Sequence, residues 1–110
     1  RDSITGFADK ILEVAGKLEG LLQTLPARVK TDIDDVSNSF NAPISYLENN
    51  KTAVQNDLNG LANDFDSLQA TYGACSVCAS QATELRAAAA DMSALVIPNG
   101  TFKVQLTTPR

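Results

Sequence analysis

The stretch ITGFADKILEVAGKLEGLLQTL, residues 4–25, decides the fold. Its large apolar side chains recur at steps of three and four residues, which places them on one face of a helix. They are Ile4, Phe7, Ile11, Val14, Leu18, Leu21 and Leu25. Leu12 and Leu22 widen this face beyond the narrow seam of a two-stranded coiled coil. The stretch therefore predicts a helix near residues 3–25 that packs inside a bundle.

A second helix is predicted beyond Pro26. Proline lacks an N–H group and disfavours helical angles at the residue before it, yet it fits the first turn of a new helix. The apolar stripe resumes through residues 29–40 and then meets Asn41-Ala42-Pro43. We expect a helix near 27–41, followed by a break. If the chain only kinks at this point, the second and third helices form one rod of about 68 Å.

The third apolar stripe is the longest, and it predicts a helix near residues 44–72. Its members are Ile44, Leu47, Val54, Leu58, Leu61, Phe65, Leu68 and Tyr72. Gly60 lies within this stripe, and glycine costs about 1 kcal/mol relative to alanine in an exposed helix. We therefore expect either a close approach of a neighbouring helix at Gly60 or a locally looser turn.

A last helix is predicted near residues 76–96, where the seam continues with smaller side chains. Pro98-Asn99-Gly100 stops this helix. Apolar and polar residues then alternate from Thr101 to Leu106, which is the period of a strand. A lone strand is not stable, so the tail must lie over the bundle, pair with another chain or lead into a following region.

Together these patterns predict an all-α fold. We expect an antiparallel helical bundle of three or four helices with heptad-like packing and a short extended C-terminal tail, because short connections make consecutive helices antiparallel. A chain of 110 residues is long enough for one core. We place the bundle domain at residues 1–97 and the tail at 98–110, either strand-like or leading to a following region.

Composition argues against several kinds of function. The net charge is −4, and Arg28 with Lys30 is too small a basic cluster to neutralise phosphates, so nucleic acid is not an expected partner. No long apolar run indicates a transmembrane segment. The chain has no histidine, which removes the usual general base and the commonest metal ligand. We therefore expect no enzyme activity, no cofactor and no metal.

The acidic residues form two groups along the chain. Asp32, Asp34 and Asp35 are the densest group, and Asp64 with Asp66 is the next. Neither group has the spacing of a calcium-binding loop, which needs a central glycine and a distal glutamate. We expect both groups to lie on solvated helix faces.

Cys75 and Cys78 are the only cysteines, and they lie where the seam thins to alanine. We favour a local disulfide, which would close a very short loop and mainly fix the turn before the last helix. Four alternatives stay open: a buried pair of thiols, bridges between two chains, a zinc ion held by two chains, and redox catalysis.

The segment Cys75-Ser76-Val77-Cys78 resembles the zinc hook of coiled-coil DNA-repair ATPases. In that family two such turns meet around one zinc ion, so the resemblance implies a zinc-bridged dimer. Ser76 stands where the family usually has proline. The heptad-like helices, prolines at helix starts and sparse cysteines also resemble the helical ectodomains of prominin-type membrane proteins.

Two triplets match the acceptor pattern for N-linked glycosylation, Asn50-Lys51-Thr52 and Asn99-Gly100-Thr101. We expect Asn50 opposite the seam and Asn99 in a turn, so both side chains should be accessible. Together with the low lysine content and the asparagine-rich polar face, these triplets favour a secreted or extracellular domain.

Two classes of function fit these observations. The first is a non-catalytic structural or interaction module, which binds protein partners or itself through its helix faces and through the tail residues Phe102, Val104 and Leu106. The alternative is a small carrier whose bundle opens around a lipid or another apolar ligand. A third hypothesis is a dimeriser bridged by zinc or disulfides at Cys75 and Cys78.

Overall fold

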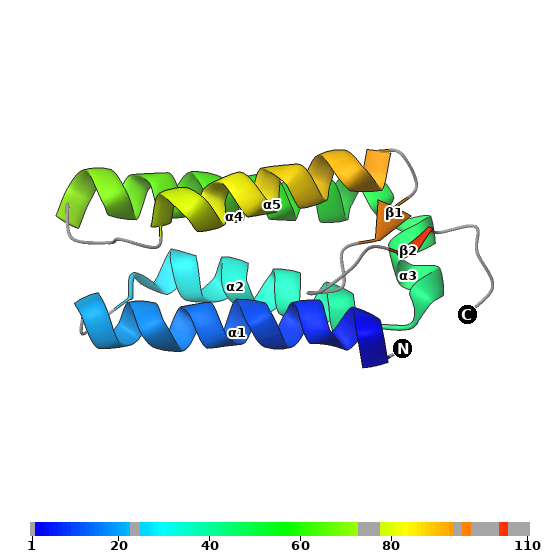
Figure 1. The fold of residues 1–110 in the computed structure, drawn as a ribbon, viewed down its shortest axis with the longest axis horizontal. Helices are drawn as coiled ribbons and strands as arrows, with labels where there is room; N and C mark the ends of the chain where they lie inside the picture. Colours follow the sequence, from blue (N-terminus) through cyan, green and yellow to red (C-terminus); the bar gives the residue numbers. More distant parts are fainter. Residues whose placement is uncertain (1, 23–24, 73–77, 94–95, 98–103, 106–110) are drawn as a thin grey trace.

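Five helices and two short strands make up the described part of the chain (Figure 1). The computed structural model describes residues 2–22, 25–72, 78–93, 96–97 and 104–105. The helices are α1 (Asp2–Leu22), α2 (Ala27–Asn41), α3 (Ile44–Asn49), α4 (Lys51–Tyr72) and α5 (Cys78–Ser93). The strands are β1 (Val96–Ile97) and β2 (Val104–Gln105). The predicted all-α fold class is confirmed.

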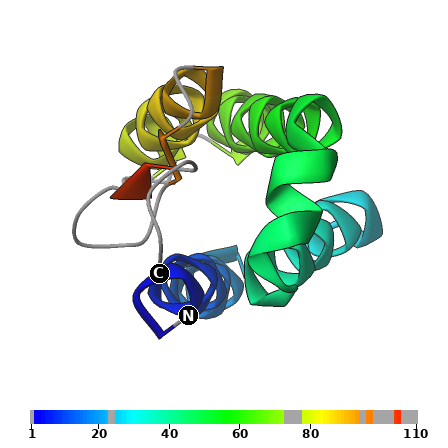
Figure 2. The same ribbon diagram turned by 90° about the vertical axis from the view of Figure 1, so that its right-hand side faces the viewer.

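The four long helices lie side by side along the longest axis of the molecule, which measures 42 × 22 × 21 Å (Figure 1). Figure 2 looks down that axis and shows α1, α2, α4 and α5 around a common centre, with α3 crossing from α2 to α4. The chain direction reverses from each long helix to the next. The 42 Å length excludes the alternative rod of about 68 Å.

The break between α2 and α3 lies where the sequence predicts it. Ala42 is extended, with φ −72° and ψ 167°, and Pro43 precedes α3 with φ −57° and ψ 151°. Pro43 enforces this geometry on its neighbour because its ring clashes with a helical residue before it. Its carbonyl accepts the first turn's hydrogen bond from the Tyr46 N–H at 2.9 Å.

A second break, at Asn50, separates α3 from α4, so the prediction of one helix over residues 44–72 is wrong. Asn50 has φ −124° and ψ 29°. Its backbone N–H and its side-chain Nδ2 both donate to the Tyr46 carbonyl at 2.9 Å. Asparagine side chains compete with the helical backbone for such hydrogen bonds, and this competition ends the short helix.

Two predicted helix ends extend too far. The described part of α1 runs to Leu22, and Leu25 is buried but not helical, because the proline that follows disfavours helical angles at this residue. At the other end α5 stops at Ser93, and Val96 belongs to β1 instead of the predicted helix over residues 76–96. Valine is β-branched and favours a strand over a helix once helical packing ends.

The C-terminal strand pairs with its own chain. β1 and β2 are antiparallel, with Val96 opposite Gln105 and Ile97 opposite Val104. This pairing is not among the three arrangements that the sequence suggests for the tail. The alternation of apolar and polar residues indicates a strand correctly, but it carries no information about the partner of that strand.

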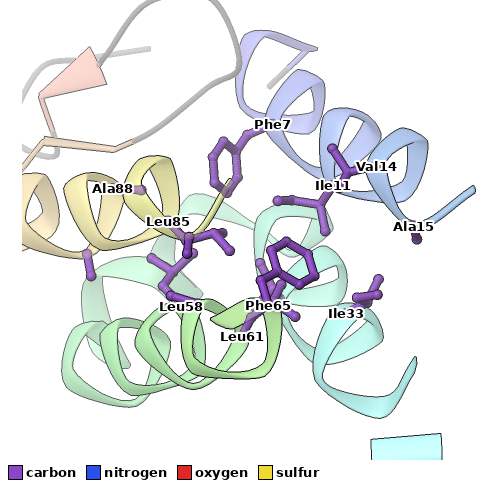
Figure 3. Close-up of a cluster of buried hydrophobic side chains, with 14 of the residues drawn as sticks. Phe7, Ile11, Val14, Ala15, Ile33, Leu58, Leu61, Phe65, Leu85 and Ala88 are labelled. Carbon is purple, nitrogen blue, oxygen red and sulfur yellow. The ribbon is translucent and has the colours of Figure 1, made fainter. Parts of the chain in front are cut away.

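The core gathers the apolar stripes of the helices. Figure 3 shows Phe7 of α1, Phe65 of α4 and Leu85 of α5 directed into the same interior. The largest fully buried side chains are Phe40, Phe65, Leu18, Leu47, Leu58, Leu61, Leu85, Met92, Val36 and Val54. Leu12, in contrast, is 46% exposed, so the expectation that it widens the buried face is wrong. It lies about 100° around the helix from buried Ile11, and this turn carries it out of the interior.

Replacing Gly60 with alanine is expected to raise the free energy of unfolding by about 0.5 to 1 kcal/mol. A Cβ atom at Gly60 would meet no atom within 4 Å, so the close approach suggested by the sequence is absent and the change adds no clash. Gly16 in α1 has the same open surroundings and provides a matched second site. Urea unfolding of each variant and of the double variant measures the gain, and a loss of stability at Gly60 would contradict the open geometry.

Candidate functional site

The predicted cysteine and glycosylation sites are only partly covered by the described residues. Cys78 is buried at the first position of α5, and Cys75 lies outside the described residues, so their bridge stays a prediction. Asn50 is half-buried in the turn between α3 and α4, and one of its Nδ2 protons is engaged with Tyr46. Asn99 lies outside the described residues, and glycosylation of both asparagines stays a prediction.

The predicted partner-binding tail is represented by one residue. Val104 lies in β2 opposite Ile97, and Phe102 and Leu106 lie outside the described residues. The backbone of Val104 pairs with Ile97 of the same chain, so this part of the tail belongs to the two-stranded sheet. Its role in partner binding stays a prediction.

The structure instead brings together acidic side chains from α2 and α4. We call Arg28, Asp32, Asp35, Asp57 and Asp64 the α2–α4 charge cluster. Asp64 is 3% exposed, and its Oδ1 lies 3.3 Å from the Arg28 Nε. The same Nε lies 3.9 Å from the Asp32 Oδ2, one turn along α2. One guanidinium group therefore faces two carboxylates from neighbouring helices.

Asp64 is the most perturbed ionisable group in the cluster. Burial is the largest cause that raises the pKa of Asp64 to about 7, and a hydrogen bond with Asp32 and the charge of Asp32 add to it. The Arg28 guanidinium acts in the opposite direction. The buried Oδ2 of Asp64 has no hydrogen-bond partner among the described residues. Because two ionised carboxylates are both acceptors, a proton on Asp64 is what allows it to donate to Asp32.

Asp57 extends the cluster toward the surface. Partial burial, followed by the charges of Asp35 and Asp32, raises the pKa of the Asp57 carboxyl above its usual range. Two like charges on α2 therefore act on Asp57 from across the helix pair. Repulsion between like charges therefore adds to burial at this end of the cluster.

Two hollows open beside Asp57. The smaller, about 70 Å³, is lined by Asp32, Asp35, Asn56, Asp57 and Gly60. The larger, about 310 Å³, is lined by Asp35, Asn38, Ser39, Ala42, Tyr46 and Asp57. Tyr46 is 39% exposed at the corner where α3 crosses from α2 to α4. An aromatic ring and two carboxylates thus share one depression.

A third hollow lies between α4 and α5 and is polar. It measures about 320 Å³ and is lined by Gln55, Asn56, Asn59, Arg86, Ala89, Ala90 and Ser93. Gln55 bridges the two helices, since its Nε2 donates to the Ala89 carbonyl at 2.8 Å and also to the Ser93 hydroxyl. The three hollows described here are lined largely by polar side chains, so none of them favours the apolar ligand of the carrier hypothesis.

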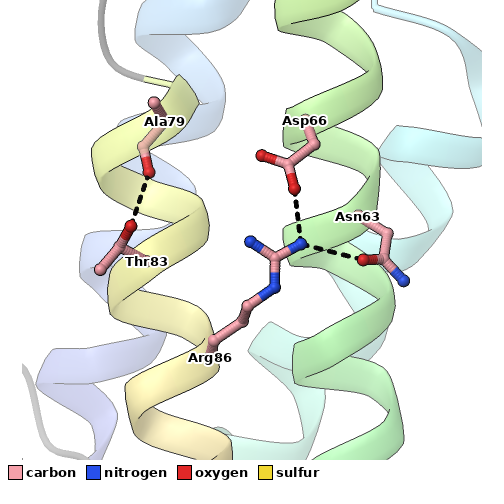
Figure 4. Close-up of polar contacts among 5 residues, drawn as sticks. All are labelled: Asn63, Asp66, Ala79, Thr83 and Arg86. Carbon is pink, nitrogen blue, oxygen red and sulfur yellow. Dashed lines mark hydrogen bonds and ion pairs between the residues drawn. The ribbon is translucent and has the colours of Figure 1, made fainter.

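Ion pairs on the outer surface join the helices around the bundle. Figure 4 shows Arg86 of α5 between Asn63 and Asp66 of α4, where its Nη2 donates to the Asn63 Oδ1 at 3.0 Å and also to Asp66. Lys10 of α1 lies 2.9 Å from Glu84 of α5. These side chains are well exposed, and exposed ion pairs contribute at most about 1 kcal/mol each.

Known proteins offer no guide to the role of these surfaces. Comparison finds no matching family model, no similar curated protein and no similar solved structure. Among the residues that the structure describes, no three histidine, cysteine or carboxylate side chains converge to hold a metal ion. No described helix is long and apolar enough to cross a membrane.

The buried carboxylate is the feature that sequence reasoning missed. Asp66 is exposed, as expected, but Asp64 is not on a solvated face, and that part of the prediction is wrong. Asp64 lies three residues after Leu61 and just before Phe65, so it borders the apolar stripe and turns toward α2. The position of Asp64 beside this stripe was the sequence signal that could have indicated its burial. Arg28 could not be predicted as the partner of Asp64, because the apolar stripes of α2 and α4 do not indicate that these two helices pack together.

Proposed function

We propose that this chain is a non-catalytic structural or interaction module that acts through protein partners or self-association. The observation that carries the proposal is Tyr46, a large aromatic side chain left 39% exposed at the rim of a hollow of about 310 Å³. Tyrosine is enriched at the energetically important centres of protein interfaces, because its ring buries a large apolar area while its hydroxyl stays hydrogen-bonded.

The charge of this surface favours a particular kind of protein partner. Asp35 and Asp57 line the hollow beside Tyr46, and the raised pKa of Asp57 reflects partial burial first and then repulsion by Asp35. A partner with a lysine or arginine side chain would relieve that repulsion and place its cation near an aromatic ring. Self-association through the same surface would oppose like charges, so it would use another face of the bundle.

The architecture proposed for the module is an antiparallel bundle with heptad-like packing. Support comes from the buried residues at steps of three and four in α2 and α4, and from the alternating direction of the long helices in Figure 1. Such a bundle presents α3 as a rigid corner. A corner that is held by two helices is a suitable platform for a binding residue, because little backbone ordering is needed on association.

We also propose that the module works in a secreted or extracellular setting. The two glycosylation triplets and the cysteine pair support this. Intact mass of the chain expressed through a eukaryotic secretory pathway, with and without reductant and chelator, would report added sugar, a two-proton deficit for a disulfide, or a zinc ion. A chain without added sugar and with both cysteines as free thiols before reductant is added would contradict the extracellular proposal.

The interaction surface is tested with a short lysine- and arginine-rich peptide titrated into the isotopically labelled chain. We expect backbone amide shifts centred on Ala42, Tyr46 and Asp57, and a loss of affinity of about tenfold or more in Tyr46→Ala, as for an interface anchor. Leu12→Ala is the matched control, because Leu12 is also a large exposed apolar side chain but lies on α1.

Two outcomes would count against the surface. Equal binding by Tyr46→Ala and by the unaltered chain would mean that the peptide recognises only diffuse negative charge. Backbone amide shifts spread over all acidic residues would also mean that the peptide recognises only diffuse negative charge. Sedimentation equilibrium over a concentration series distinguishes the self-association form, which predicts a dimer whose stability is unaffected by Tyr46→Ala.

A further inference from the structure

The contact between α2 and α4 contains a carboxylate that the proposed interaction surface does not use. Asp64 is almost fully buried, and its Oδ2 has no hydrogen-bond partner among the described residues. Leaving a buried polar atom unpaired is costly, and more so when the group is charged. A structural carboxylate would be expected to have both oxygens satisfied, so this one is held in an arrangement that suits only one of its protonation states.

The charged groups that act on Asp64 all come from α2. They are Arg28, whose Nε lies 3.3 Å from the Asp64 Oδ1, and Asp32. The other charged groups on elements packed against α4 are Asp34, Asp35, Lys30, Glu48, Glu84, Arg86 and Asp91. None of these is among the groups that shift the Asp64 pKa. Besides burial, the influences on the proton equilibrium of Asp64 therefore come from side chains of α2.

We propose that Asp64, Asp32 and Arg28 form a proton-controlled latch between α2 and α4. With one proton shared between the two carboxyl groups, a single negative charge faces the single guanidinium and the buried oxygen gains a hydrogen bond. With both groups ionised, two negative charges share one cation and Asp64 is drawn toward water. Because the Asp64 side chain is buried against α2, where its Oδ1 lies 3.3 Å from the Arg28 Nε, loss of the proton loosens that helix pair.

The latch is independent of the proposed binding role of Tyr46. It works by a difference in proton affinity between the closed and open arrangements, and each pH unit of that difference changes the closed-to-open ratio by about tenfold. The closed pair holds the proton up to about pH 7, whereas a solvated aspartate releases it near 3.8. The population of the open pair is thus expected to rise as the pH increases from about 4 to about 7.

The latch is tested by two measurements on the unaltered chain. Carboxyl-carbon NMR should show the Asp64 signal titrating near neutral pH, with a pKa of about 7. Native-state amide exchange, corrected for the intrinsic pH dependence, should show faster opening of α2 and α4 at higher pH, by up to about tenfold per pH unit. An Asp64 carboxyl that titrates in the ordinary acidic range would overturn the proposal.

Three variants separate the latch from a general effect of charge. Asp64→Asn should remove the pH dependence of α2 and α4 exchange, because the amide imitates the protonated acid at every pH. Asp66→Asn, two residues along the same helix, should keep it. Arg28→Gln should move the transition to higher pH, because the guanidinium holds the Asp64 pKa down. Unchanged pH dependence of exchange in Asp64→Asn would refute the latch. If Asp64→Asn does not fold, an unshifted transition in Arg28→Gln would refute it instead.

Discussion

Replacing Phe40 with alanine is expected to lower the free energy of unfolding by about 3 to 5 kcal/mol. Phe40 is fully buried in the last turn of α2, and its ring centroid lies 4.7 Å from that of Phe7 in α1 at an interplanar angle of 57°. This tilted ring pair contributes about 0.5 to 1.5 kcal/mol beyond the burial of apolar area. The remainder of the loss comes from the cavity that alanine would leave.

The rigid break after Phe40 makes this cavity difficult to close. Ala42 and Pro43 are extended, and they fix the end of α2 against the start of α3. Urea unfolding followed by circular dichroism measures the loss. Leu12→Ala is the control, because Leu12 is 46% exposed and its truncation is expected to cost less than about 1 kcal/mol. Equal losses in the two variants would contradict the buried position of Phe40.

Replacing Asp64 with asparagine is expected to raise the free energy of unfolding at pH 8 by a few kcal/mol, with roughly 4 kcal/mol as the upper limit. The sign follows from the proton affinity. The folded chain holds the Asp64 proton with a pKa of about 7, and the ordinary value is 3.8. The folded state therefore binds more protons than the unfolded state between these two values, and stability falls as the pH rises through this window.

The full contribution of Asp64 to stability is present below about pH 4 and is lost above about pH 7. Asparagine cannot ionise, can donate to Asp32 and can accept from Arg28, so it keeps the stable form at every pH. Denaturation midpoints measured from pH 5 to pH 8 should fall for the unaltered chain and for Asp66→Asn, and should stay nearly constant for Asp64→Asn. A stabilisation at pH 8 that persists unchanged at pH 5 would argue against ionisation as its cause.

Apolar periodicity predicted the helices of this chain well, because burial of one helix face dominates their stability. It located Pro26 and Pro43 as boundaries, since proline acts locally through its missing N–H and its ring. The break at Asn50 escaped it, because Leu47 and Val54 on either side of Asn50 keep the seven-residue spacing of a continuous helix. There the deciding interaction is a pair of hydrogen bonds to Tyr46, and hydrogen bonds leave no trace in the pattern of apolar residues.

The candidate site was much less predictable than the fold. Asp64 and Asp66 are separated by the single residue Phe65 in the sequence, yet Asp64 is buried and Asp66 is exposed. Their difference depends on where α2 packs, which is a property of helix pairing and not of local sequence. The hollow beside Tyr46 could not be predicted from local sequence either, because it forms where α3 turns between two helices. Sequence reasoning placed binding at the cysteines and the tail, where chemically distinctive residue types occur.

The short corner helix α3 also divides the chain into two successive hairpins, α1 with α2 and α4 with α5 (Figure 1). Each hairpin joins helices that are neighbours in the sequence, so most of its contacts close short loops and cost little chain entropy. Topologies with such local contacts reach their native state within microseconds to milliseconds. The search for the native fold is thereby reduced to the docking of two preformed halves, with Phe40 at the corner where they meet.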